Sequence, residues 1–175
     1  GSGKTVIAAL AIFHSYKNNW QSSFLCPTEV LAEQHFNSLS ELFFSEGLRV
    51  EILTGSTPQK KRLGIINGLI KGEIDLLVGT HAIFQQDVNF HNLGLTIIDE
   101  QHRFGVHQRF SMLRKGLIED INPHQLIMTA TPIPRTLAHT VYGSLEVTTI
   151  DELPPGRIPV ATSARTVKMR NRIIK

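Results

Sequence analysis

The chain opens on Gly1-Ser2-Gly3-Lys4-Thr5, and a segment with helical apolar periodicity follows directly. Glycines let a backbone curl until its N–H groups converge on phosphate oxygens, and the positive end of the following helix adds to this attraction. The stretch matches the second half of a G-x-x-x-x-G-K-[ST] phosphate-binding loop, in which the lysine reaches the β- and γ-phosphates and the hydroxyl binds Mg²⁺. It therefore predicts a nucleotide-binding site formed by Gly1, Ser2, Gly3, Lys4 and Thr5, with Lys4 as a catalytic cation and Thr5 as a metal ligand.

This opening has two other interpretations. One is a glycine-rich helix start without a ligand. The other is a dinucleotide-binding fingerprint, which would need a third glycine at position 6, where the chain has Val6. In a phosphate-binding loop, the first glycine and the strand before it would lie upstream of residue 1. We therefore expect the chain to be a piece of a longer protein that lacks its first strand.

A pair of carboxylates follows a second apolar run, at residues 95–98. Asp99 and Glu100 stand at the carboxyl end of this expected strand, where ligands bind in open α/β sheets. Asp99 can hold Mg²⁺ through water, and Glu100 can orient and deprotonate an attacking water. An acidic turn at a strand end is common by itself, but its combination with Gly3-Lys4-Thr5 favours a site for ATP and Mg²⁺.

Two hydroxyl residues follow a third apolar run, in Met128-Thr129-Ala130-Thr131-Pro132. Hydroxyls at a strand end can bridge the phosphate site and a second surface. A Thr-Pro pair also caps helices, and both roles are compatible.

Composition narrows the class of protein. The chain has 175 residues, of which 41% are hydrophobic and 19% charged, so it can bury one ordinary core. No apolar run approaches the roughly 20 residues of a membrane-spanning helix, and no secretory signal is visible. Its single cysteine, Cys26, excludes an internal disulfide framework and a multi-cysteine zinc site. We expect a cytoplasmic protein.

Basic charge is concentrated at the end of the chain. Residues 1–150 hold 12 Lys and Arg against 13 Asp and Glu, whereas residues 151–175 hold 6 against 2. Such a segment is a solvated face or a nucleic-acid contact, and charge alone does not separate the two.

Apolar runs alternate with helix-period segments, which indicates an α/β fold. Strands are expected at residues 23–26, 50–53, 75–78, 95–98 and 126–128, with a further one at 146–150. Helices are expected at residues 4–16, between Pro27 and Gly47, from Thr57 to Gly72, and over a short stretch after Pro132. Their apolar faces are predicted to hold Val6, Ala9, Leu10 and Phe13 in the first helix, Leu31, His35, Leu39, Leu42 and Phe43 in the second, and Leu63, Ile66 and Ile70 in the third.

Together these motifs resemble those of superfamily 2 helicases of the D-E-x-H type. Gly3-Lys4-Thr5, Asp99-Glu100-Gln101-His102 and Thr129-Ala130-Thr131 are similar to their motifs I, II and III. The longer strings at residues 99–106, 129–137 and 151–157 closely resemble RecG-type DNA helicases. The transcription-repair coupling factor shares much of this pattern, and Gln101 favours the RecG type. The resemblance implies a RecA-like P-loop NTPase lobe, with a mostly parallel sheet and helices on both faces.

The resemblance also implies roles for further residues. His102 would act in catalysis and would link the nucleotide site to motif III. The coupling residues would be Gln101, His102, Thr129, Thr131 and Arg135. Pro27-Thr28-Glu29, Thr54-Gly55-Ser56 and Val78-Gly79-Thr80-His81 are similar to nucleic-acid-facing motifs. Hydroxyls and backbone N–H groups there would hold phosphates without reading bases, which gives Thr28, Thr54, Gly55, Ser56, Thr80 and His81 as DNA-binding candidates. Helix capping is the alternative for Thr28 and Thr57.

The implied function is that of an ATP-dependent DNA helicase. Residues 1–153 would form the first RecA-like lobe, and residues 154–175 a linker and the start of the second lobe, so the basic segment would not be a DNA-binding arm. The whole protein would move on duplex DNA and remodel branched DNA as a monomer. Its partners would be DNA, the second lobe and an N-terminal wedge domain of the same chain, and the isolated piece would be inactive. The alternatives are another superfamily 2 motor, such as an RNA helicase or a coupling-factor translocase, and a non-motor nucleotide-binding switch.

Overall fold

The structure, a computed structural model, describes residues 3–100, 122–130 and 146–150. Helices and strands alternate along the chain, as the periodicity predicts. The elements are α1 (Lys4–Lys17), β1 (Gln21–Leu25), α2 (Glu29–Phe43), the 3₁₀ helix η1 (Phe44–Glu46), β2 (Val50–Leu53), α3 (Gln59–Ile70), β3 (Leu76–Gly79), the 3₁₀ helix η2 (His81–Phe84), β4 (Leu93–Asp99) and β5 (His124–Met128).

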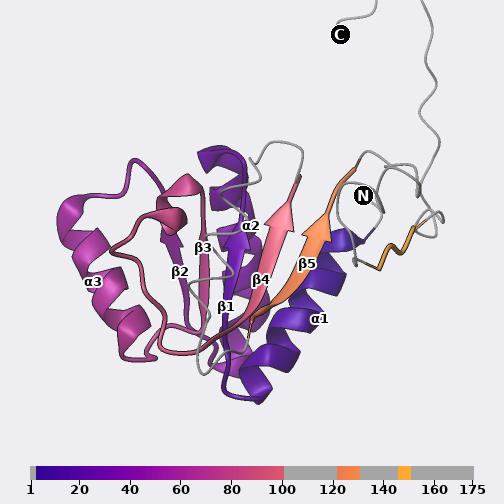
Figure 1. Cartoon of the computed structure of the whole chain (residues 1–175), viewed down its shortest axis with the longest axis horizontal. Helices are drawn as coiled ribbons and strands as arrows, with labels where there is room; N and C mark the ends of the chain where they lie inside the picture. Colours follow the sequence, from indigo (N-terminus) through magenta and orange to yellow (C-terminus); the bar gives the residue numbers. More distant parts are fainter. Residues whose placement is uncertain (1–2, 101–121, 131–145, 151–175) are drawn as a thin grey trace, which may run out of the picture.

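The strands form one five-stranded sheet in the order β2-β3-β1-β4-β5, and every pair of neighbours is parallel. Figure 1 shows the sheet with α3 near β2 and β3 and with α1 near β5. Parallel neighbours need long crossover connections, and α2 and α3 supply two of them. The predicted α/β fold with a parallel sheet is confirmed.

Apolar side chains cover both faces of the sheet. Because successive strand residues point to opposite faces, Phe24 and Leu25 enter different clusters. The Phe24 cluster packs against α1 and α2, through Ala9 and Leu39 among others. The Leu25 cluster packs against α3 and η2. The predicted arrangement, with helices on both faces of the sheet, is thus present.

The predicted apolar faces are partly wrong. In α1 the buried residues are Ala8, Ala9 and Ile12, whereas Val6 and Leu10 are 62% and 65% exposed. This helix is apolar around most of its circumference, so periodicity alone does not select the face that meets the sheet. The same correction applies to Leu42 of α2 and to Leu63 and Ile70 of α3, which are exposed.

Two expectations about loops also change. Residues 146–150 form no strand and are exposed. Thr57 does not cap α3: its hydroxyl accepts a hydrogen bond from the N–H of Thr54, and Pro58 stands at the N-cap position. Gly47 and Gly72 follow η1 and α3 as predicted stops. The short helix after Pro132 and the boundary at residues 154–156 lie outside the described residues.

One buried polar side chain, at the start of β1, bonds to several segments at the edge of the sheet where the strands begin. Nε2 of Gln21 donates to the carbonyls of Leu69 and Ile74, and its Oε1 accepts from the N–H groups of His91 and Asn92. All polar atoms of this amide are therefore used in joining α3 and the segment before β4 to β1.

None of the helices described is long and apolar enough to cross a membrane.

Gly79 tests the packing of β3 against β2. A Cβ added at Gly79 would lie 2.0 Å from the carbonyl oxygen of Leu53, which is backbone and cannot move aside alone. We expect Gly79→Ala to lower the free energy of unfolding by about 3 kcal/mol, at the upper end of the cost of overpacking. Urea denaturation measures this change.

Gly64→Ala is the matched control. Gly64 lies within α3, and a Cβ there meets nothing within 4 Å. Alanine should stabilise the protein by about 1 kcal/mol because it is the better helix former. Equal effects of the two substitutions would contradict the close approach of β2 and β3.

Candidate nucleotide and nucleic-acid site

The carboxyl ends of the five parallel strands meet at one edge of the sheet, the usual place for ligands in open α/β folds. Asp99 and Thr129 lie at the ends of β4 and β5. The hydroxyl residues Thr28, Thr54 and Thr80 follow β1, β2 and β3. The strand order therefore separates this edge into a carboxylate half and a hydroxyl half. Figure 1 shows that α1 starts at the same edge, near the tip of β5.

The start of α1 has the backbone geometry of a helix end that can bind an anion. Gly3 has a φ of 83°, a left-handed conformation that glycine adopts without the strain of a side chain. Its carbonyl accepts from Val6 N–H, and no side chain caps the helix. Among the residues that the structure describes, none lies within 4 Å of a Cβ placed at Gly3. The free N–H groups of the first turn and the helix dipole favour phosphate there.

Two hydrogen bonds hold the Asp99 carboxylate, one from the next residue and one from a distant helix. Oδ1 of Asp99 accepts from the N–H of Glu100 at 3.1 Å, and Oδ2 lies 3.2 Å from Nε2 of His35 on α2. Glu100 has a φ of 50°, which is uncommon for a residue with a side chain. Such conformations concentrate at functional sites. The chain therefore changes direction at Glu100, directly after the end of β4 at Asp99.

The donor atoms fit Mg²⁺. No group of three or more His, Cys, Asp or Glu residues forms a metal cluster in the part of the chain that the structure describes. Mg²⁺ needs no such cluster, because it is usually held by one or two carboxylates together with phosphate oxygens and water. The carboxylate of Asp99 and the hydroxyl of exposed Thr5 offer oxygen atoms of this kind. We expect these two residues to hold Mg²⁺ with a bound nucleotide.

Cys26 is a packing residue. Its side chain is fully buried, and burial together with the nearby Asp99 carboxylate raises the pKa of the thiol to about 12. The thiol therefore stays neutral at physiological pH. This agrees with the prediction of a core cysteine.

In the hydroxyl half, loops after three strands come together. The hydroxyl of Thr28 caps α2 by accepting from Leu31 N–H, which confirms its capping role. The Glu29 carboxylate accepts from Ser56 Oγ at 2.8 Å and from Ser56 N–H at 3.1 Å. A Cβ at Gly55 would lie 3.2 Å from Glu29 Oε1 and 3.9 Å from the His81 ring. Glu29 therefore joins the motif at residues 27–29 to the one at residues 54–56, and His81 of the third motif lies next to Gly55.

The DNA-binding candidates differ in exposure. Gly55, Ser56 and His81 are exposed, whereas Thr54 and Thr80 are buried. The Thr54 hydroxyl bonds to Ser56 Oγ, so it holds the loop in shape. Direct phosphate contact stays a prediction for the exposed members of the set.

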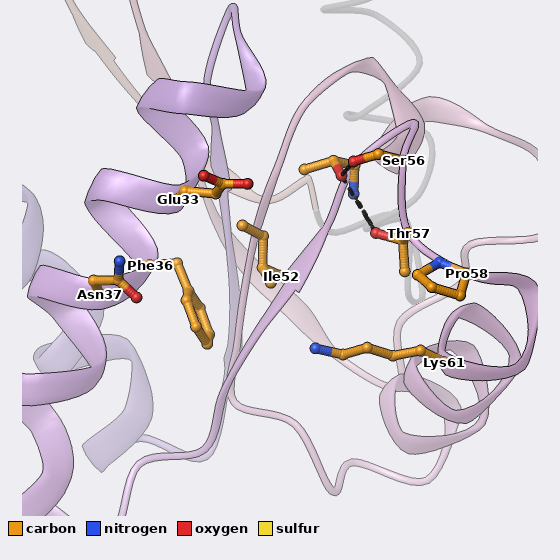
Figure 2. Close-up of a pocket in the computed structure, with 9 residues that line it drawn as sticks. Glu33, Phe36, Asn37, Ile52, Ser56, Thr57, Pro58 and Lys61 are labelled. Carbon is orange, nitrogen blue, oxygen red and sulfur yellow. Dashed lines mark hydrogen bonds between the residues drawn. The ribbon is translucent and has the colours of Figure 1, made fainter.

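A pocket of about 360 Å³ adjoins Ser56 between α2 and α3. Figure 2 shows Glu33, Phe36 and Asn37 on the α2 side and Lys61 on the α3 side. Lys61 Nζ lies 3.5 Å from a Glu51 carboxylate oxygen.

The neighbouring Arg62 is buried and makes a bidentate contact with Asp87, in which NH2 lies 2.7 Å from Oδ1. Of the basic residues at the start of α3, Arg62 is therefore structural and does not present its charge at the surface.

Sequence reasoning missed the roles of Glu29 and His35. Glu29 adjoins Thr28 in the motif, which was a usable signal. His35 was assigned to the core face of its helix, and nothing local indicates its contact with Asp99. The predicted residues Gly1, Ser2, Gln101, His102, Thr131 and Arg135 lie outside the described residues.

Comparisons with known proteins identify the family. A family model for DEAD/DEAH box helicases matches residues 1–140. The chain belongs to the DEAD/DEAH box helicase family. Among curated proteins, this helicase chain is 51% identical over 174 residues to the ATP-dependent DNA helicase RecG of Escherichia coli, and 55% identical over 170 residues to that of Synechocystis sp.. These matches cover 99% and 97% of the chain but 25% and 20% of the relatives, so it spans about a quarter or less of their length.

Solved structures agree with this similarity. A structure of RecG bound to a three-way DNA junction matches 99% of this helicase chain and 22% of its own, with a TM-score of 0.80 and 43% identity. The DNA-bound DUF1998 helicase MrfA matches 79% of the chain and 20% of its own, with a TM-score of 0.59 and 21% identity, which supports the fold alone. The resemblance to RecG-type helicases is confirmed.

The Glu29–Ser56 contact predicts a measurable titration. Hydrogen bonds from Ser56, its side chain first, hold the pKa of the Glu29 carboxyl below its ordinary value. The lowered pKa means that this contact stabilises the fold above the ordinary carboxyl pKa and is lost as pH falls through the folded value. Ser56→Ala should raise the Glu29 pKa toward its ordinary value, as followed by carbon NMR of the carboxyl.

Ser38→Ala is the control, since Ser38 is exposed on the same helix. It should leave the Glu29 titration unchanged. An unaltered Glu29 pKa in Ser56→Ala would show that the contact does not form in solution.

Proposed function

We propose that this chain is the ATP-binding lobe of a RecG-type DNA helicase. In the full-length protein, ATP hydrolysis would drive movement on duplex DNA and remodelling of branched DNA. The single observation that supports this most is the shared edge of the sheet. One half of this edge holds the start of α1, with Gly3 and Lys4, and the carboxylates of Asp99 and Glu100, and the other half holds the hydroxyl loops that Glu29 and Ser56 join. Relatives near 50% identity carry the name RecG, and one solved RecG is bound to a three-way junction.

Each residue has a chemical task in this proposal. The Lys4 ammonium offsets the charge of the β- and γ-phosphates, and the N–H groups at the start of α1 orient them. Glu100 orients the attacking water and accepts its proton. Mg²⁺, when bound through Thr5 and Asp99, would neutralise negative charge on the phosphates. Gln101, His102, Thr129, Thr131 and Arg135 would couple this chemistry to the DNA side.

The remaining parts of the proposal concern the whole protein. Residues 1–153 would form the first lobe, and residues 154–175 would lead into a second lobe. The second lobe and a wedge domain would be partners within the same chain, and the protein would act as a cytoplasmic monomer. A second lobe would supply arginines to the γ-phosphate. Arginines supplied from outside the nucleotide-binding lobe are worth 10³–10⁵ in rate in related nucleotide hydrolases, so the lobe by itself would hydrolyse ATP poorly.

Lys4→Ala in the full-length protein should abolish ATP hydrolysis stimulated by branched DNA, because the positive charge at the phosphates is lost. DNA affinity should change little, since Lys4 is not on the hydroxyl half of the edge. A steady-state ATPase assay and a DNA-binding titration measure the two effects. RNA in place of DNA separates the DNA-helicase proposal from an RNA-dependent motor.

Lys17→Ala controls for loss of a lysine from the same helix, because Lys17 lies at its far end and pairs with Glu46 at 3.8 Å. It should keep the ATPase rate. Hydrolysis by Lys4→Ala within tenfold of the parent, about 1.4 kcal/mol of barrier, would refute the phosphate-loop assignment.

Glu100→Gln separates binding from chemistry. The amide keeps the shape of the side chain but cannot accept the proton, so the turnover rate should fall by about 10²–10⁴ while ATP still binds. A fluorescent nucleotide titration and a single-turnover assay give the two values. Glu73 is exposed, and Glu73→Gln is the matched control, which should change neither the nucleotide affinity nor the turnover rate. Equal turnover rates of the Glu100→Gln and Glu73→Gln variants would exclude Glu100 as the base.

A further inference from the structure

The contact between His35 and Asp99 joins a helix of the hydroxyl half to the carboxylate half. Nε2 of His35 lies 3.2 Å from Oδ2 of Asp99, and both side chains are 13% exposed. An ionised carboxylate only accepts hydrogen bonds, so the imidazole donates its Nε2 proton. A donor in this place fixes the rotation of the Asp99 side chain.

The imidazole is itself held from several sides. The ring of Phe24 packs against it with a centroid distance of 4.6 Å. Ala32 and Leu39 bury the same face of α2 against the sheet. At its start, α2 is secured by the Thr28 cap and by the Glu29–Ser56 contact. The donor is therefore presented by a rigid element.

The contacts at Asp99 leave room for a metal ligand role. Oδ1 receives the N–H of Glu100 and Oδ2 receives His35. Each carboxylate oxygen has two lone-pair directions, so one on each remains for water or a cation.

We propose that His35 is a positioning residue that orients the Asp99 carboxylate for Mg²⁺ in the nucleotide site. The proposal rests on the proposed function, in which Asp99 is a metal ligand. Residues that hydrogen-bond to a ligating carboxylate commonly change metal affinity by 10–100-fold when they are replaced. If His35 only filled space, replacing it would change folding and nucleotide binding by the same amount with and without Mg²⁺.

The test measures the affinity of the full-length protein for a fluorescent ATP analogue. One titration with the analogue is made in the presence of Mg²⁺ and a second in the presence of EDTA. His35→Leu removes the donor and keeps an apolar side chain against Phe24. It should weaken the Mg²⁺-dependent binding of the nucleotide by 10–100-fold and leave binding in EDTA unchanged. Thermal unfolding without ligand reports whether the variant is folded.

Two amide variants make the test specific for the donor atom. In His35→Gln the side-chain N–H₂ reaches a position close to that of Nε2, so most of the Mg²⁺-dependent affinity should return. In His35→Asn the shorter amide does not reach Asp99, and the defect should persist. Exposed Gln34 supplies the control Gln34→Leu, which should behave as the parent.

Two results would overturn the positioning role and show that His35 has only a structural one. The first is an equal loss of nucleotide affinity in Mg²⁺ and in EDTA, and the second is the same loss of affinity in His35→Gln as in His35→Leu. If His35→Leu does not fold, the comparison of the Gln and Asn variants still decides. Failure of the proposed function looks different: the parent protein itself would then show no Mg²⁺-dependent nucleotide binding, and Lys4→Ala would bind as the parent does.

Discussion

All the strands that the structure describes run in the same direction, and the candidate functional residues within the described part of the chain owe their positions to this constraint. Parallel pairing returns the chain to the same starting edge after each crossover, so every strand ends at the opposite edge. Segments far apart in sequence then meet there as loops. This rule brings to one edge the start of α1, which we propose binds phosphate, the carboxylates at the end of β4 and the hydroxyl loops.

Close packing of the backbones of neighbouring strands also positions the loops at this edge. Gly79 lets β3 approach the Leu53 carbonyl of β2, which sets the loops of the hydroxyl half side by side. At the other end of the sheet, the buried amide of Gln21 fixes α3 and the segment before β4 to the central strand. The edge opposite the ligand edge is therefore held together by the hydrogen bonds of this one amide.

Helix α2 is the element that contacts both halves of the site. Its first residues cap the helix and hold Ser56 through Glu29, while His35 further along contacts Asp99. A helix packed on the sheet through Ala32 and Leu39 moves as a unit. The nucleotide and nucleic-acid sides of the proposed helicase are therefore connected by one short, stiff segment of chain.

The sequence by itself determined the α/β class, the alternation of elements and the residues that follow each strand, because these follow from local periodicity and motif spacing. It also predicted the Thr28 cap and the stops at Gly47 and Gly72, which are local features. Only the tertiary structure decided which face of α1 is buried, since that helix is apolar on several sides. It alone placed Thr54, Thr80 and Arg62 below the surface and paired Glu29 with Ser56 and His35 with Asp99. These pairs join residues from different crossovers, and no local pattern in a single chain specifies which distant side chains a parallel sheet will bring together.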